Sequence, residues 1–106
     1  MAEFVAVADS SEVSDGSSLL VEVEEQLIVL IHAAGHFYAL DDVCTHDGGP
    51  LSEGPIDAAA GTIACPRHGA KFDVKTGSAV TMPATSATIV HEVKVENGRV
   101  YVRLNR

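Results

Sequence analysis

The sequence predicts an all-β domain, a small antiparallel β-sandwich or barrel. Two observations favour this fold class. Short apolar runs follow one another closely and are separated by turn-forming residues, while no stretch has the periodicity of an amphipathic helix. Near the C-terminal end, two alternating segments flank Asn97-Gly98, a dipeptide that supplies the two positive φ angles of a type I′ hairpin turn.

Four strands are expected in the first forty residues. They are Phe4–Val7, Leu19–Val23, Gln26–His32 and His36–Leu40. The third is a continuous apolar run, which predicts a strand buried on both faces. Glu24-Glu25 and Ala34-Gly35 are expected to turn the chain between neighbouring strands. Residues 9–18, half of them serine, predict a loop with room for one helical turn.

Two short hairpins are expected in the middle of the chain. Residues 56–58 and 62–64 flank the turn at Gly61. In the same way, residues 71–74 and 78–80 flank Thr76-Gly77. Both hairpins are short because turn formers interrupt the apolar runs.

The C-terminal hairpin pairs residues 89–96 with residues 99–104. Its alternation assigns side chains to a buried and an exposed face. The side chains expected in the core are Val93, Val95, Val100, Val102 and Leu104. Those expected to face outward are Lys94, Glu96, Arg99, Tyr101 and Arg103.

The 106 residues suffice for one domain, residues 1–106, and a hydrophobic content of 46% excludes wholesale disorder. The formal net charge is −8, and no basic stripe accompanies stackable aromatics, so nucleic acid is not an expected partner. The N-terminus has no basic stretch with a long apolar run, and no window approaches the roughly 18 apolar residues of a membrane span. We therefore expect a cytoplasmic protein with no membrane partner.

Two segments rich in turn formers carry the candidate chemistry. They contain the motifs Cys44-x-His46 and Cys65-x-x-His68, separated by eighteen residues. A reducing compartment favours metal ligation by the two cysteines over a disulfide. Two thiolates and two imidazoles can close a tetrahedral zinc site, or supply two ligands to each iron of a [2Fe–2S] cluster. The other histidines lie on expected strands, where a structural or solvated role is favoured: His32, His36 and His91.

The two motifs resemble the fingerprint of Rieske-type [2Fe–2S] ferredoxins in order and spacing. Neighbouring residues match as well, including Leu51-Ser-Glu-Gly after the first motif. Around the second motif the matching residues are Pro66, Gly69, Phe72 and Asp73. The resemblance extends over nearly the whole chain and implies the Rieske fold, with two cluster-binding loops at one tip.

The resemblance also implies a ligand set and a cofactor, one [2Fe–2S] cluster per chain. Cys44 and Cys65 would bind one iron, and His46 and His68 the other. With only two thiolates, such a cluster is neutral when oxidised, whereas a four-thiolate cluster is already negative. An electron is therefore added more easily, which gives potentials of about −150 to +300 mV against about −400 mV for plant-type clusters.

Within this range the sequence favours the low-potential end. High-potential Rieske proteins carry an extra cysteine in each loop, together with a serine and a tyrosine whose hydroxyls donate to sulfur. This chain has no further cysteine, and Ala70 and Phe72 stand at the positions of the two hydroxyl donors. Without those donors the reduced, more negative state is less stabilised.

The function implied by the resemblance is one-electron transfer, with no catalysis by the chain itself. The expected partners of this monomeric carrier are a flavoprotein ferredoxin reductase and a terminal non-haem iron oxygenase. One alternative is the Rieske-like small subunit of an assimilatory nitrite reductase, although such subunits often lack the complete ligand set found here. A zinc-stabilised interaction module is the alternative from another class.

Overall fold

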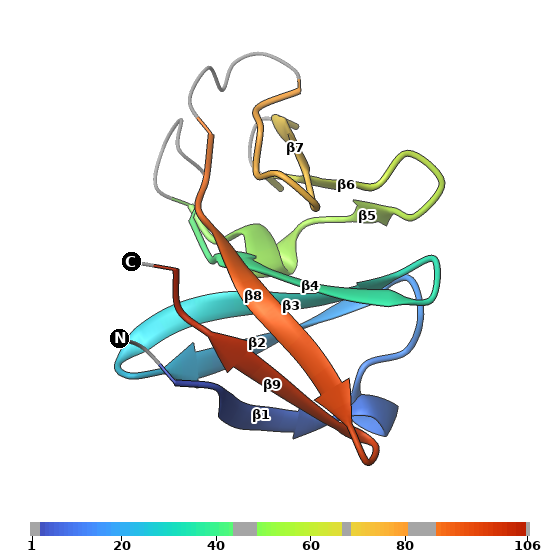
Figure 1. The fold of residues 1–106 in the computed structure, drawn as a ribbon. Coiled ribbons are helices and arrows are strands. Elements are labelled where there is room, and N and C mark those ends of the chain that lie inside the picture. Colours follow the sequence, from blue (N-terminus) through green and yellow to red (C-terminus); the bar gives the residue numbers. More distant parts are fainter. Residues whose placement is uncertain (1–2, 44–48, 67–68, 81–86, 106) are drawn as a thin grey trace.

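The chain folds into nine strands and two single turns of 3-10 helix in the computed structural model, which describes residues 3–43, 49–66, 69–80 and 87–105 (Figure 1). In chain order these elements are β1 Val5–Asp9, η1 Ser10–Glu12, β2 Ser17–Val23, β3 Gln26–Ala33, β4 His36–Asp41, η2 Leu51–Glu53, β5 Ile56–Asp57, β6 Thr62–Ala64, β7 Lys71–Asp73, β8 Val90–Glu96 and β9 Arg99–Arg103. The predicted all-β class is confirmed. No helix in these described segments is long and apolar enough to cross a membrane.

Six strands form one antiparallel sheet in the order β1-β9-β8-β4-β3-β2 (Figure 1). The predicted turns join β2 to β3 and β3 to β4, with positive φ angles at Glu24 (50°), Glu25 (69°), Ala34 (51°) and Gly35 (80°). Such angles match the right-handed twist of the flanking strands. The edge strands β1 and β2 also contact each other, so the sheet curls into a nearly closed barrel.

Strand β3 is buried on both faces, as its apolar run predicts. Because successive side chains of a strand point to opposite faces, Val29 and Ile31 join one buried cluster, and Ile28 and Leu30 join another. Each of these fully buried side chains stabilises the fold by about 1.5–3 kcal/mol. The barrel cluster comprises Val13, Val23, Ile28, Leu30, Ala39, Val100, Val102 and Leu104. The inter-sheet cluster comprises Val29, Ile31, Ala33, Leu40, Leu51, Ile63, Cys65, Ala70, Phe72 and Val74.

A second, three-stranded sheet in the order β5-β6-β7 covers the inter-sheet cluster (Figure 1). The predicted hairpin at Gly61 is confirmed as β5 and β6, although β5 is only two residues long. The predicted pairing of residues 78–80 with β7 is present but is too short to form a strand, because it consists of a single bridge from Phe72 to Ala79. The N–H of Asp73 donates to the carbonyl oxygen of Ser78 at 2.9 Å, and the N–H of Val80 donates to the carbonyl oxygen of Lys71 at 2.7 Å. The pairing is short because Ser78 still belongs to the turn, where its N–H donates to the hydroxyl of Thr76.

The C-terminal hairpin has the predicted type I′ geometry, with φ angles of 53° at Asn97 and 75° at Gly98. On β9 the predicted inward face is confirmed, because Val100 and Val102 are fully buried and Leu104 beyond them is 4% exposed.

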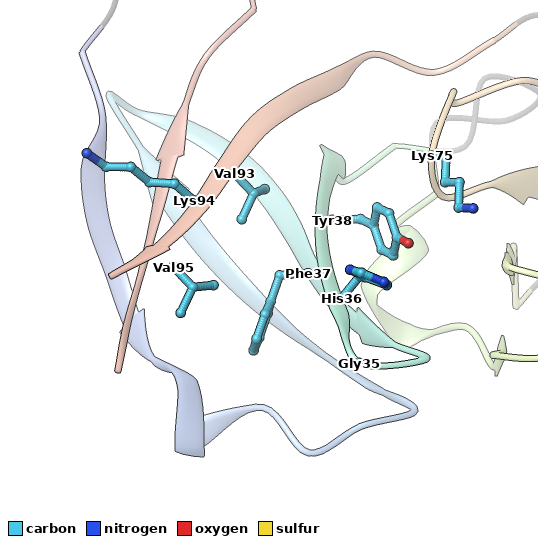
Figure 2. Close-up of a pocket in the computed structure, with 8 residues that line it drawn as sticks. All are labelled: Gly35, His36, Phe37, Tyr38, Lys75, Val93, Lys94 and Val95. Carbon is cyan, nitrogen blue, oxygen red and sulfur yellow. The ribbon is translucent and has the colours of Figure 1, made fainter. Parts of the chain in front are cut away.

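On β8 the prediction fails at Val95, whose exposed fraction is 49%. Strand β8 pairs with β4 only at Val90 and His91, and beyond these residues the two strands diverge. The divergence leaves a hollow of about 450 Å³ on one side of β8. Figure 2 shows its lining, which consists of Gly35, His36, Phe37, Tyr38, Lys75, Val93, Lys94 and Val95.

Candidate functional site

Of the four predicted ligands, only Cys65 belongs to the described part of the chain. Cys44, His46 and His68 lie outside the described residues. Within residues 3–43, 49–66, 69–80 and 87–105, no three His, Cys, Asp or Glu side chains are grouped so as to hold a metal ion. The site is therefore built from Cys65 and from the residues that flank the two ligand segments. The first ligand segment connects β4 to η2 and carries Cys44 and His46, and the second connects β6 to β7 and carries Cys65 and His68.

Cys65 directly follows β6 and is 1% exposed, within the inter-sheet cluster. Its N–H donates to the carbonyl oxygen of Ala70 at 2.7 Å, and the N–H of Gly69 donates to the carbonyl oxygen of Cys65 at 2.9 Å. These two bonds fasten the ends of the second ligand segment to each other. Gly69 has a φ angle of 74°, a left-handed conformation in which a side chain is strained.

The first ligand segment begins after Asp41, the last residue of β4, whose carboxylate accepts two hydrogen bonds. One oxygen of Asp41 accepts from Nε2 of Gln26 at 2.6 Å and lies 2.7 Å from Nε2 of His91. The N–H of Asn105 donates to Nδ1 of His91 at 2.9 Å, so the proton of this imidazole is on Nε2 and is donated to Asp41. The start of the first segment is thereby bound to β3, β8 and the C-terminal end.

The histidines on strands have the structural or solvated roles predicted for them. His91 is buried in the hydrogen bonds just described. His32 contacts the carbonyl oxygen of Val13 through Nδ1 at 2.8 Å and stacks on Phe37. His36 is exposed at the turn that begins β4.

Gly54 brings the end of the first ligand segment against the start of the second. It follows η2, and a Cβ atom added to it would lie only 1.7 Å from the carbonyl oxygen of Ala64, the residue before Cys65. The N–H of Ala64 also donates to the carbonyl oxygen of Pro55 at 3.0 Å. Only a residue without a side chain permits this approach of the two backbones.

The ends of the two ligand segments consequently pack in the same buried apolar cluster. Leu51, which follows the first segment, packs in the same inter-sheet cluster as Cys65 and Ala70, which flank the second. Cys65 lies at the start of the second ligand segment, where the end of the first segment approaches closely. This position suits a ligand of a group that binds between the two segments. The apolar surroundings of Cys65 exclude water, which suits a cysteine that ligates a metal.

Sequence reasoning identified the four candidate ligands but missed the residues that support them. The support comes from Asp41, His91 and Gly54. A weak signal was available for two of them, since Asp41 stands just before the first motif and Gly54 ends the matching Leu51-Ser-Glu-Gly segment. His91 gave no signal, because its partner Asp41 is 50 residues away along the chain.

Comparison with protein families gives a match over most of the chain. Residues 3–99 match the family described as the Rieske [2Fe-2S] domain. The chain is also 36% identical, over 94 residues, to the 3-phenylpropionate/cinnamic acid dioxygenase ferredoxin subunit of Escherichia coli K12. That alignment covers 89% of this chain and 87% of the relative.

Solved structures share the fold. One is described as a complex of reduced oxygenase and oxidised ferredoxin in carbazole 1,9a-dioxygenase; the matched chain has a TM-score of 0.87 and 36% identity, with coverage of 94% of this chain and 92% of the other. Another is the putative NADH-dependent nitrite reductase small subunit from Mycobacterium tuberculosis, with a TM-score of 0.87 over 100% of this chain and 98% of that one. At 17% identity, the second likeness concerns the fold alone.

Proposed function

The chain belongs to the Rieske [2Fe-2S] domain family, and from this premise we propose that Cys44, His46, Cys65 and His68 hold its cluster. The family carries one [2Fe–2S] cluster per chain. The observation that supports the ligand set is a shared apolar cluster, in which Leu51, just after the first ligand segment, packs together with Cys65 and Ala70 at the two ends of the second. We assign the two cysteines to one iron and the two histidines to the other, within a single domain of residues 1–106.

The function is that of a Rieske ferredoxin, which carries one electron to the terminal oxygenase of a dioxygenase system. The chain is an electron-transfer component and not the catalyst of the oxygenation. When bound, the cluster would accept and donate one electron at a time. The protein contributes the hydrogen bonds that hold the ends of the ligand segments, the buried side chain of Cys65 and the apolar cluster around it that excludes water.

The electron donor that we propose is a flavoprotein ferredoxin reductase. A carrier must receive each electron before it delivers it, and flavins convert the two-electron oxidation of a nicotinamide into single-electron steps. A cytoplasmic location and a monomeric state fit this shuttle, because the carrier has to leave one partner before it meets the other.

Two alternatives have less support. The nitrite reductase small subunit shares the fold at 17% identity, against 36% for the dioxygenase ferredoxin subunit. The zinc-stabilised module does not agree with family membership, which implies an iron–sulfur cluster.

A stopped-flow experiment tests the proposed transfer. The holoprotein is first reduced anaerobically by a flavoprotein ferredoxin reductase with NADH. The loss of visible absorbance of the holoprotein measures the rate of this first step. The reduced protein is then mixed with the oxidised terminal oxygenase of a 3-phenylpropionate dioxygenase. We expect rapid reoxidation with stoichiometric reduction of the oxygenase. Reoxidation no faster than with buffer alone, or reduction by the reductase no faster than without it, would contradict the proposal.

The tuning of the potential gives a second prediction. Ala70 and Phe72 are both fully buried beside Cys65 in the inter-sheet cluster. We expect Ala70→Ser combined with Phe72→Tyr to raise the midpoint potential, because hydroxyl donors stabilise the reduced, more negative cluster. Each donor should contribute tens of millivolts, since about 59 mV corresponds to a tenfold change for one electron.

Protein-film voltammetry measures this potential directly. Ala79→Ser is the matched control. Ala79 packs against the same inter-sheet hydrophobic cluster, but it pairs with Phe72 on the side of β7 that faces away from β6. Its potential should remain that of the unmodified protein. An unchanged or lowered potential in the double variant, with full iron content, would show that these positions do not set the potential.

A further inference from the structure

Asp42 joins the two ends of the first ligand segment. It lies two residues before Cys44, and both of its carboxylate oxygens bond to Ser52, which follows the segment. The N–H of Ser52 donates to Oδ1 at 2.6 Å, and the hydroxyl of Ser52 donates to Oδ2 at 3.1 Å. Ser52 is part of the Leu51-Ser-Glu-Gly segment that matches the family, and ligand chemistry alone gives this serine no role.

Both partners of this pair are themselves fixed. The N–H of Asp42 donates to the carbonyl oxygen of Leu27 at 3.2 Å, which ties it to β3. The hydroxyl of Ser18 donates to the carbonyl oxygen of Ser52 at 3.2 Å, which ties η2 to β2. Leu51, next to Ser52, is fully buried. The carboxylate therefore connects the start of the segment to an element that is anchored in the barrel.

We propose that Asp42 and Ser52 form a clamp that holds the two described ends of the first ligand segment together and so slows the loss of the cluster. This inference rests on the proposed function, since it takes Cys44 and His46 as ligands. Asp42 is a positioning residue, because it acts on the ligands only through the backbone. Closing a loop costs conformational entropy, and hydrogen bonds to a charged carboxylate are among the stronger ones that can offset this cost.

The clamp makes a prediction about the lifetime of the cluster. In Asp42→Ala both bonds are lost, so Asp42 and Ser52 are no longer held together, and the ligands between them should exchange more readily with solvent and chelator. We expect the holoprotein to lose iron to a chelator about tenfold faster, equivalent to about 1.4 kcal/mol. Asp42→Asn should restore most of the lifetime, since its amide oxygen can still accept from the N–H of Ser52.

Two further variants separate the clamp from general effects. Asp57→Ala is the matched control, because it also removes an acidic side chain that accepts from a backbone N–H, that of Ala60 at 3.1 Å, in the turn between β5 and β6. Ser52→Ala removes one bond of the clamp and keeps the other. It should lose iron about threefold faster than the unmodified protein, and Asp57→Ala at the unmodified rate.

The experiment follows the decay of visible absorbance in excess chelator and records the electron paramagnetic resonance spectrum of each reduced holoprotein. A loosened segment should broaden or shift the spectrum in Asp42→Ala, and Asp42→Asn should recover it. The clamp is wrong if Asp42→Ala matches Asp57→Ala in both readouts. If Asp42→Ala does not fold, the result for Ser52→Ala tests the clamp instead. A decay of visible absorbance in Ser52→Ala at the rate of the unmodified protein would then contradict the clamp. A failure of the unmodified chain to bind iron and sulfide would instead contradict the proposed function.

Discussion

Cys65→Ser is expected to give a folded protein without colour. Serine is close to cysteine in size, so it fits the buried position in the inter-sheet cluster, but its hydroxyl is a poor ligand for iron at neutral pH. Cys44→Ser, outside the described residues, should have the same effect. Both variants should also unfold at a lower temperature than the holoprotein, because a group that binds only the folded chain stabilises it. Visible absorption and the content of iron and acid-labile sulfide measure the loss.

Histidine variants supply the comparison for this prediction. His46→Ala and His68→Ala should lose the cluster, whereas His36→Ala should retain it, since His36 is exposed at the start of β4. If Cys65→Ser retained full iron and sulfide, the ligand assignment would be wrong. The same conclusion would follow if His36→Ala were the histidine variant that lost the cluster.

Gly54→Ala is expected to be strongly destabilising. The new Cβ would lie 1.7 Å from the backbone oxygen of Ala64, and a backbone atom cannot move aside by rotation of a side chain. The bases of the two ligand loops must then separate, which breaks the bond from Ala64 to Pro55 and disturbs the packing at Cys65. We expect the free energy of unfolding to fall by about 3 kcal/mol, the upper end of ordinary overpacking.

Chemical denaturation and thermal melting of the apoprotein measure this effect without any contribution from the cluster. For a domain of this size, a loss of about 3 kcal/mol lowers the melting temperature by more than about 10 °C. Gly61→Ala is the control, because its φ angle of 70° is strained for alanine but nothing lies within 4 Å of the added atom. It should cost about 1 kcal/mol. Equal stability of the two variants would contradict the close approach of the two loops.

Local patterns in the sequence predicted most of the fold. Turns such as Asn97-Gly98 and strands such as β3 depend on neighbouring residues, and their period and turn chemistry are visible in the sequence. The exposure of Val95 is not local, since it follows from the divergence of β8 from β4 after His91. The single bridge at Ala79 likewise depends on how the hydroxyl of Thr76 occupies the N–H of Ser78.

The candidate site divides in the same way. The ligand motifs are local in sequence, and the family match supports the cofactor that they predict. The supporting contacts join residues far apart in the chain, as in the bond from His91 to Asp41 and the approach of Gly54 to Ala64. Asp42 and Ser52 are only ten residues apart, yet no sequence pattern indicates their hydrogen bonds, which depend on where the structure places η2.

The central claim, that two cysteines and two histidines hold one [2Fe–2S] cluster, is tested most directly by pulsed electron paramagnetic resonance of the reduced protein after anaerobic reconstitution with iron and sulfide. We expect one signal per chain with hyperfine couplings from two nitrogen ligands, and loss of that signal in His46→Ala and in His68→Ala. A reconstituted protein that shows no nitrogen coupling, or that takes up zinc and neither iron nor sulfide, would contradict the account.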